Sequence, residues 1–235
     1  MGWKRQSCLN VGSHLPGGLV NGSLAVAEAL EMGQWLRASG YMCKSFAPNR
    51  EALFEAVARR IEHSAVLYLE FGVWQGASMR AWSTLLKNPE SQLHGFDSFV
   101  GLPEDWIPGF QKGHFSTGGD CPNSVDPRVK FFKGWFHETL PHYVLPPHEV
   151  LVINIDSDLY LPARYVLDFL APHFRPGDFL YFDEFHIPHD EVRAFREFTR
   201  NTDVAFSLFG ATMGYSGTVF KCEKSPLAAE PASLG

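Results

Sequence analysis

The sequence is poor in cysteine and has no long apolar run. Its cysteines, four in 235 residues, are Cys8, Cys43, Cys121 and Cys222, and none forms a Cys-x-x-Cys pair. This spacing disfavours a zinc site or a disulfide framework and is typical of reduced thiols in a cytoplasmic protein. No apolar stretch approaches the ~20 residues of a membrane span. The first residues carry basic side chains without an apolar region after them, so we expect neither a signal peptide nor a membrane partner.

Positive charge is also scarce. The chain has 20 Lys and Arg against 26 Asp and Glu, which gives a net charge of −6. A nucleic-acid-binding protein needs a basic face to replace the counterions of the phosphates. No Lys/Arg run is present, so we expect no nucleic-acid partner. The Gly-x-Gly-x-x-Gly motif of dinucleotide-binding folds is missing after the first apolar strand, which disfavours a nicotinamide or flavin cofactor.

The composition is that of a globular protein with one well-buried core, since 45% of the residues are hydrophobic and 20 are phenylalanine. From residue 65 onward, apolar segments alternate with segments of helical periodicity, which is typical of a parallel sheet covered on both faces. We therefore predict an α/β fold with a doubly wound, mostly parallel seven-stranded sheet whose last strand is antiparallel. The expected strands are 65–72, 92–99, 128–135, 149–158, 179–185, 204–210 and 217–223.

Three parts are expected along the chain. Residues 1–60 form a helical extension, with one helix from Ser23 to about Leu36 and another over 51–62, whose apolar residues share one face. This extension is a cap over a site or the surface of a homodimer. Residues 61–223 form the main domain, and residues 224–235 form a flexible tail.

The first strand ends in an acid and a glycine turn. Glu70 and Gly72 close the strand, and Gly76 opens the next helix. Glycines let the backbone approach a ligand, and a helix N-terminus offers free N–H groups. Asp97 ends the second strand, where an acid can accept both hydroxyls of a ribose. Taken singly, a tight strand-to-helix turn and a capping Asp would explain these residues equally well.

Acids also end the fourth and fifth strands. Asp156 and Asp183 are expected on neighbouring strand ends, roughly 5 Å apart by strand spacing. Together with Glu184 they form a cluster of like charges that repel unless one is protonated or a cation lies among them. Oxygen ligands of this kind suit Mg²⁺. The alternative is that one acid faces the cleft while the others cap helices or pair with Arg164 or Arg193.

Five stretches, LEFGVWQGAS, GFDSFVGLPEDW, FFKGWFHETLP, INIDSDLY and LYFDEF, together resemble the class I S-adenosylmethionine-dependent methyltransferases. More narrowly, the chain resembles the macrocin-type O-methyltransferases, which methylate sugar hydroxyls in antibiotic biosynthesis, over residues 65 to 222. The resemblance implies a Rossmann-like methyltransferase fold with S-adenosylmethionine as cofactor. It implies cofactor binding by Glu70, Gly72, Val73, Gly76, Ser78, Asp97 and Ser98.

The same resemblance implies Mg²⁺ bound by Asp156, Asp183 and Glu184, with Asp156 also a base for the acceptor hydroxyl. Glu184 stands where the family more often has a second Asp, and Asp158 is expected to orient the turn. His186 is a second candidate base, and His189 lies nearby. A base near neutral pKa removes the hydroxyl proton while a bound metal lowers its pKa.

The segment 101–127 is too long for an ordinary connection and is predicted to be a lid over the acceptor. Its aromatic residues Trp106, Phe110, His114 and Phe115 would cover the acceptor or pack the lid onto the body. Trp135 and Phe136 are expected mainly to fill the core, with the adenine side as the alternative.

The sequence therefore predicts a cytoplasmic, Mg²⁺-assisted O-methyltransferase that acts on a hydroxyl of a small molecule, either a sugar or a natural product. One alternative is a non-catalytic cofactor-binding or scaffold protein of the same fold. A nicotinamide-dependent oxidoreductase is the third hypothesis, against which the glycine pattern speaks.

Overall fold

The computed structural model describes residues 11, 13 and 15–226. Cys8, the start of the chain and residues 227–235 of the predicted tail lie outside the described residues. The chain divides into two compact units, residues 1–42 and 43–235. Among the described residues, no helix combines the length and the apolar character that a membrane span requires.

The first unit contains the helix α2, Gly17–Ala38. The predicted start at Ser23 is therefore wrong, because the helix begins earlier in the glycine-containing segment that follows Pro16. Pro16 precedes the helix with a φ of −57°, and its carbonyl accepts a hydrogen bond from the N–H of Leu19 at 2.9 Å. The fixed φ of proline suits the entry into a helix.

The second unit is built on a seven-stranded sheet with the order β3-β2-β1-β4-β5-β7-β6. Its first five strands are parallel, and β7 runs antiparallel to both β5 and β6. This confirms the predicted α/β fold, including the antiparallel last strand. The strands are β1 Val66–Phe71, β2 Gln92–Asp97, β3 Val129–Lys133, β4 Val150–Ile155, β5 Phe179–Phe182, β6 Ala205–Ala211 and β7 Thr218–Lys224.

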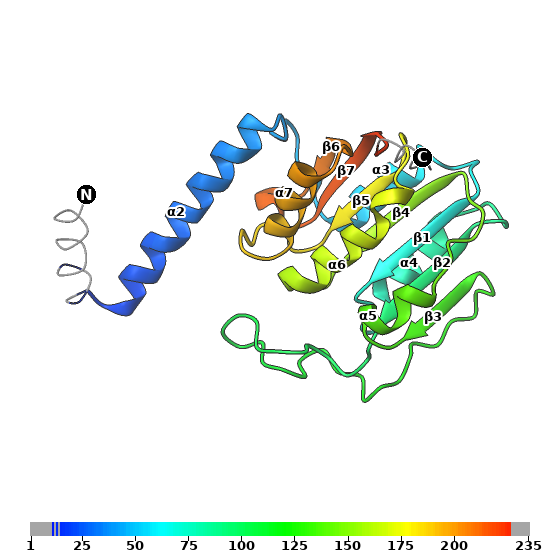
Figure 1. The fold of residues 1–235 in the computed structure, drawn as a ribbon, viewed down its shortest axis with the longest axis horizontal. Helices are drawn as coiled ribbons and strands as arrows, with labels where there is room; N and C mark the ends of the chain where they lie inside the picture. The colour runs from blue at the N-terminus through cyan, green and yellow to red at the C-terminus, as the bar shows by residue number, and fades with distance from the viewer. Residues whose placement is uncertain (1–10, 12, 14, 227–235) are drawn as a thin grey trace, which may run out of the picture. The chain divides into compact units, whose positions relative to one another are not determined.

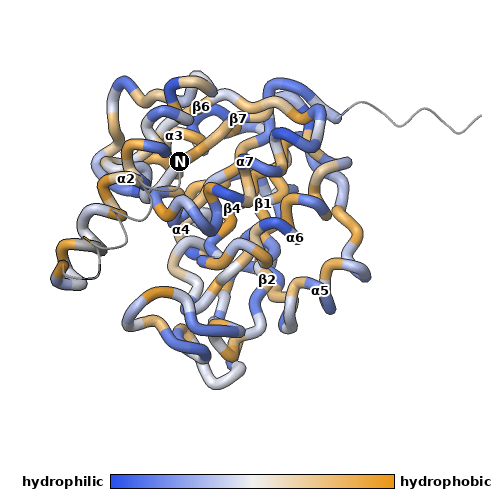
Figure 2. The backbone as a smooth tube through the Cα atoms, turned by 60° about the vertical axis from the view of Figure 1, so that its left-hand side comes forward, coloured by the Kyte–Doolittle hydropathy of each residue, from blue (hydrophilic) through white to orange (hydrophobic). Residues whose placement is uncertain are grey.

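Helices cover both faces of this sheet (Figure 1). On one face α3 packs beside α4, and on the other α6 packs between α5 and α7. Hydrophobic and hydrophilic residues alternate along the helices in Figure 2, as expected when one side of each helix is buried. The helices of this unit are α3 Arg50–Ala58, α4 Ala77–Leu85, α5 Phe136–Thr139, α6 Tyr160–Leu170 and α7 Glu191–Asn201, with short 3₁₀ turns at Leu140–His142, Ala171–His173 and Met213–Tyr215.

Helix α3 belongs to the core of the second unit. Its apolar side buries Leu53, Phe54 and Val57 in one cluster with Tyr68 and Trp82. The ring centroids of Phe54 and Trp82 are 5.3 Å apart. The predicted boundary after residue 60 stays a prediction, but the side chains of this helix pack as part of the sheet domain.

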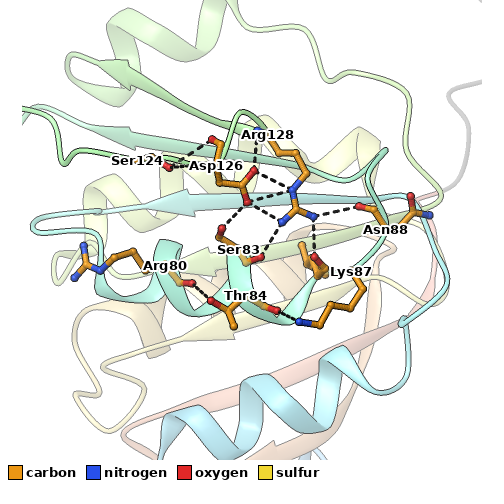
Figure 3. A network of polar contacts seen from close by, with 9 residues as sticks. Arg80, Ser83, Thr84, Lys87, Asn88, Ser124, Asp126 and Arg128 are labelled. Atoms are coloured by element: carbon orange, nitrogen blue, oxygen red, sulfur yellow. Dashed lines mark hydrogen bonds and ion pairs between the residues drawn. The ribbon is translucent and has the colours of Figure 1, made fainter.

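The long segment 101–127 is anchored at its far end by a polar network (Figure 3). The guanidinium of Arg128 donates to the carboxylate of Asp126 and to the backbone carbonyls of Ser83, Leu86 and Asn88. The hydrogen bonds that Arg128 donates to the carboxylate of Asp126 hold the pKa of this group well below its usual range. Because three of the acceptors lie in or after α4, the network ties the start of β3 to that helix.

Candidate active site

A cavity of about 780 Å³ lies at the carboxyl ends of the parallel strands. Ligands bind at this edge of open α/β sheets, and the size suits a small molecule. Of the residues predicted to bind the cofactor or a metal or to act as catalytic base, Gly76 is outside the wall; it is the N-cap of α4 and has a left-handed φ of +73°. The cavity is lined by the predicted residues Glu70, Gly72, Val73, Ser78, Asp97, Ser98, Asp156, Asp183, Glu184 and His186.

Asp97 faces the glycine turn after β1. Its Oδ2 accepts hydrogen bonds from the backbone N–H groups of Val73 and Trp74, both at 2.8 Å. Its Oδ1 accepts from the N–H of Phe99 at 2.7 Å. The carboxylate is thus held between the ends of β1 and β2. Hydroxyl groups of a diol would donate to the same carboxylate oxygens that already accept the backbone N–H groups.

Gly72 brings the ends of β1 and β4 into contact. Its φ is +93°, in the left-handed region that glycine favours. A Cβ atom at this position would lie 1.7 Å from the backbone oxygen of Asp156. Only glycine therefore allows the turn beneath Asp97 to touch the strand that carries the acid cluster.

Glu70 is buried beneath this turn. Its Oε2 accepts a hydrogen bond from the hydroxyl of Tyr68 at 2.8 Å, and Asn154 donates to the same hydroxyl at 3.2 Å. Burial raises the pKa of Glu70 to about 8, although the Tyr68 hydrogen bond and the charge of Arg50 act in the opposite direction. The carboxyl is therefore protonated in a large fraction of molecules at neutral pH.

We predict that the protein loses stability as the pH rises from about 5 to 8. In the unfolded chain Glu70 releases its proton near the ordinary glutamate pKa of 4.5, whereas the folded carboxyl keeps it up to about 8. The folded state then binds more protons, so the free energy of unfolding falls, by on the order of a few kcal/mol. Glu70→Gln should reduce this fall in urea titrations across the range, and the exposed Glu55→Gln should not. An unchanged slope in Glu70→Gln would contradict the prediction.

The acids after β4 and β5 share one environment. Burial and the neighbouring carboxylates of Asp183 and Asp158 raise the pKa of Asp156 well above its usual range. Burial, followed by the charge of Glu184, raises the pKa of Asp158 to about 7. Burial and then Asp183 raise the pKa of Glu184 to about 7. Asp158 and Glu184 therefore exchange protons near neutral pH, and Asp156 holds its proton more tightly than an ordinary Asp does.

Two of the three acids predicted to bind Mg²⁺, Asp183 and Glu184, have side-chain partners from the protein itself. Asp183 accepts a hydrogen bond from the Tyr181 hydroxyl at 2.6 Å, and its other oxygen lies 3.5 Å from a guanidinium nitrogen of Arg50. Glu184 lies 3.2 Å from Nδ1 of His186. Within residues 11, 13 and 15–226, no group of three or more His, Cys, Asp or Glu side chains has a geometry that could hold a metal ion. The structure thus does not support the predicted metal site, because Asp183 faces a guanidinium and a hydroxyl of the protein and Glu184 faces an imidazole.

Two residues at the site were missed in the sequence. Glu191, at the start of α7, is 0% exposed. It accepts hydrogen bonds from the backbone N–H groups of Ser157 at 3.1 Å and of Glu184 at 3.2 Å. It therefore holds the two acid-bearing turns together, but in the sequence it looks like an ordinary first-turn acid of a helix. Arg50 was placed in the extension, and no signal linked it to the cavity.

The predicted lid contributes aromatic walls. Trp106, Phe110 and Phe115 line the cavity, and the indole N–H of Trp106 donates to Asp190 at 2.9 Å. This bond attaches the lid to the N-terminus of α7. His114 does not line the cavity but packs edge-on against Phe115 with centroids 4.5 Å apart.

Trp135 and Phe136 also line the cavity. The expectation that they mainly fill the core was wrong, because the short helix α5 presents them at the end of β3 and neither is fully buried. Phe136 packs edge-on against Phe71 with ring centroids 5.5 Å apart. His189 is not one of the described residues that line the cavity.

Comparison with known protein families agrees with the predicted resemblance. Residues 123–215 match the family described as macrocin-O-methyltransferase (TylF). A Streptomyces olivaceus protein, 8-demethyl-8-(2,3-dimethoxy-alpha-L-rhamnosyl)-tetracenomycin-C 4'-O-methyltransferase, is 30% identical over 150 residues, which are 54% of this chain and 57% of that protein. Mycinamicin III 3''-O-methyltransferase from Micromonospora griseorubida is 31% identical over 110 residues, 46% of this chain and 40% of that protein. The chain therefore spans about half the length of these relatives.

The solved structures that share the fold include two methyltransferases. The O-methyltransferase NovP superposes with a TM-score of 0.59 at 21% identity, covering 80% of this chain and 88% of that chain. A calicheamicin methyltransferase superposes with a TM-score of 0.57 at 20% identity, covering 83% and 91% of the two chains. At this identity the likeness bears on the fold alone, and it confirms the predicted Rossmann-like methyltransferase architecture.

Proposed function

Taking as premise that this chain is related to the macrocin-type O-methyltransferases, we propose that it transfers a methyl group from S-adenosylmethionine to a hydroxyl of a small molecule. The observation that carries this proposal is that the Gly72 turn, Asp97 and the acids after β4 and β5 line the same cavity. A nucleoside held by one half would place its methyl donor beside the acids of the other half. Holding donor and acceptor near contact distance supplies a large part of such a rate enhancement.

In the proposed binding mode, Asp97 receives the ribose hydroxyls, with Ser98 beside the adenine and Val73 and Ser78 along the cofactor. Glu70, Gly72 and Gly76 shape the pocket for the amino-acid portion. The support is positional: Asp97 already accepts three backbone N–H groups, which fix its carboxylate toward the cavity. The walls of Trp135 and Phe136 offer flat apolar surface for a base.

In the proposed reaction the acceptor oxygen attacks the methyl carbon as the carbon–sulfur bond breaks. The products are the methyl ether and S-adenosylhomocysteine, and the hydroxyl proton passes to Asp156. Burial and its acidic neighbours raise the pKa of Asp156. A bound sulfonium cation would favour its ionised form, so the base would become available when the donor is present.

His186 is the second candidate base. Burial lowers its pKa, which keeps the imidazole neutral at pH 7. Its Nδ1 lies 3.2 Å from Glu184, and a carboxylate at one ring nitrogen leaves the other free to accept a proton. The proposed step uses no metal, because Asp183 and Glu184 have other partners; assistance by Mg²⁺ stays a prediction from the sequence, as do the cytoplasmic location and the homodimer.

The proposed acceptor is a sugar-bearing natural product. The two relatives named above act, by their names, on a rhamnosyl-tetracenomycin and on a mycinamicin. The lining of the cavity also includes Trp106, Phe110 and Phe115 of the lid and Leu161 and Tyr165 of α6. Aromatic side chains of this kind suit the faces of sugar rings and of fused apolar ring systems.

Calorimetry with S-adenosylhomocysteine tests the proposal. We expect one binding site per chain, with Asp97→Asn weakening the affinity by about tenfold to a hundredfold because the hydrogen bonds of ribose to a charged acceptor are lost. Asp168→Asn, on the exposed surface of α6, should bind like the wild type. No binding would refute the proposal, and binding of NADH instead would favour the oxidoreductase. Binding without transfer to any hydroxylated acceptor would favour the non-catalytic alternative.

A further inference from the structure

One positive side chain faces the acid-lined end of the cavity. Seven Asp and Glu residues line it, and Arg50 is the one Arg or Lys among the described lining residues. A guanidinium nitrogen of Arg50 lies 3.5 Å from Oδ2 of Asp183. The positive charge of Arg50 also acts on Glu70 and Asp156. Arg50 thus stands where closely spaced carboxylates need a cation.

Arg50 is held in place by the packing of its helix. Asn49 caps α3 by accepting a hydrogen bond from the N–H of Ala52 at 2.9 Å, which fixes Arg50 as the first helical residue. Behind it, Phe54 packs edge-on against Tyr181, with ring centroids 5.0 Å apart. The hydroxyl of Tyr181 donates to Asp183. One packed unit therefore positions the backbone of Arg50 and the carboxylate of Asp183 for this contact, while Nε of Arg50 also lies 3.4 Å from the exposed Glu51.

We propose that the guanidinium of Arg50 is the resident cation of the acid cluster, taking the place of a divalent metal ion and positioning Asp183. The occupied oxygens of Asp183 and the contact of Glu184 with His186 carry the inference. A metal ion would have to displace Arg50 from Asp183 and would meet its positive charge at short range. This inference deepens the proposed function and rests on it for the role of the acid cluster.

Titration with Mn²⁺ as a probe for Mg²⁺ tests the inference without any methyl acceptor. The wild-type chain, Arg50→Gln and Arg50→Lys are stripped with EDTA and titrated by calorimetry and electron paramagnetic resonance. Arg50→Gln should bind Mn²⁺ at least about tenfold more tightly than the wild type, because the competing charge is gone. Its melting temperature should rise with Mn²⁺, while those of the wild type and Arg50→Lys should not. Arg59→Gln, an exposed change next to the same helix, should match the wild type.

The inference is overturned if the wild type binds Mn²⁺ as tightly as Arg50→Gln, whether both bind it or neither does. Should Arg50→Gln fail to fold, the wild type decides: a melting temperature lowered by EDTA and restored by Mn²⁺ overturns the inference, and an unchanged one supports it. Because the readout is metal binding, this result is independent of S-adenosylhomocysteine binding. Failure of the inference and failure of the proposed function are therefore distinguishable.

Discussion

Replacing Gly72 by alanine is expected to abolish S-adenosylhomocysteine binding and to lower the free energy of unfolding by roughly 3 kcal/mol or more. A Cβ at this position would lie 1.7 Å from the backbone oxygen of Asp156, which is far inside van der Waals contact. The backbone of β4 cannot yield without disturbing its pairing with β1 and β5. The turn must therefore move, and the two backbone N–H groups bound by Asp97 move with it.

Gly177→Ala is the matched control for this prediction. Gly177 has a similar φ of +104°, but no atom lies within 4 Å of an added Cβ. Its free energy of unfolding should fall by only about 1–2 kcal/mol, the cost of an alanine in the left-handed conformation. Its affinity for S-adenosylhomocysteine should stay unchanged. Chemical denaturation and calorimetry of the two variants separate steric contact from backbone strain. If both variants lost the same stability and the same ligand affinity, the close approach of Gly72 to Asp156 would have no special role.

Asp156→Asn is expected to reduce methyl transfer by about 10²–10⁴-fold, the usual contribution of a general base. The amide has nearly the same shape but does not accept the hydroxyl proton at neutral pH. The affinity for S-adenosylhomocysteine should change only a few-fold, because the proposed cofactor contacts lie at Asp97 and the Gly72 turn. The assay is single-turnover transfer to a rhamnosylated acceptor that the wild type methylates.

His186→Gln is the control for the assignment of the base. The side chain of His186 is 47% exposed. We expect the methyl-transfer rate of His186→Gln to fall by less than about tenfold in the same assay. If the methyl-transfer rate fell more in His186→Gln than in Asp156→Asn, His186, oriented by Glu184, would be the base. If Asp156→Asn instead lost S-adenosylhomocysteine binding, Asp156 would be a cofactor-binding residue.

The sheet could be predicted because its signals are local and repeated. Apolar segments such as Val150–Ile155 alternate with helical segments, and the short connection before Thr218 excludes a crossover. The carboxyl ends of the strands then follow from topology, which is why Asp97, Asp156 and Asp183 could be placed on one edge. Topology places these residues at one edge, but whether all of them face the same cavity was left open by the sequence and is answered by the structure.

Contacts between distant segments could not be predicted in this way. Arg50 reaches Asp183 across more than a hundred residues, because α3 packs on the sheet through Leu53 and Phe54. Glu191 looks like a surface acid at a helix start, yet it is buried between the turns of Ser157 and Glu184. The structure does not support the predicted metal site for the same reason. The pattern of acids is visible in the sequence, but the side chains that contact Asp183 and Glu184 are not.

A crystal structure with S-adenosylhomocysteine tests the central claim most directly. The account predicts the ribose hydroxyls at the carboxylate of Asp97, the sulfur directed toward Asp156, and Arg50 beside Asp183 in a structure grown with Mg²⁺. A nucleoside bound outside the cavity, or one whose sulfur points away from the acids after β4 and β5, would contradict it.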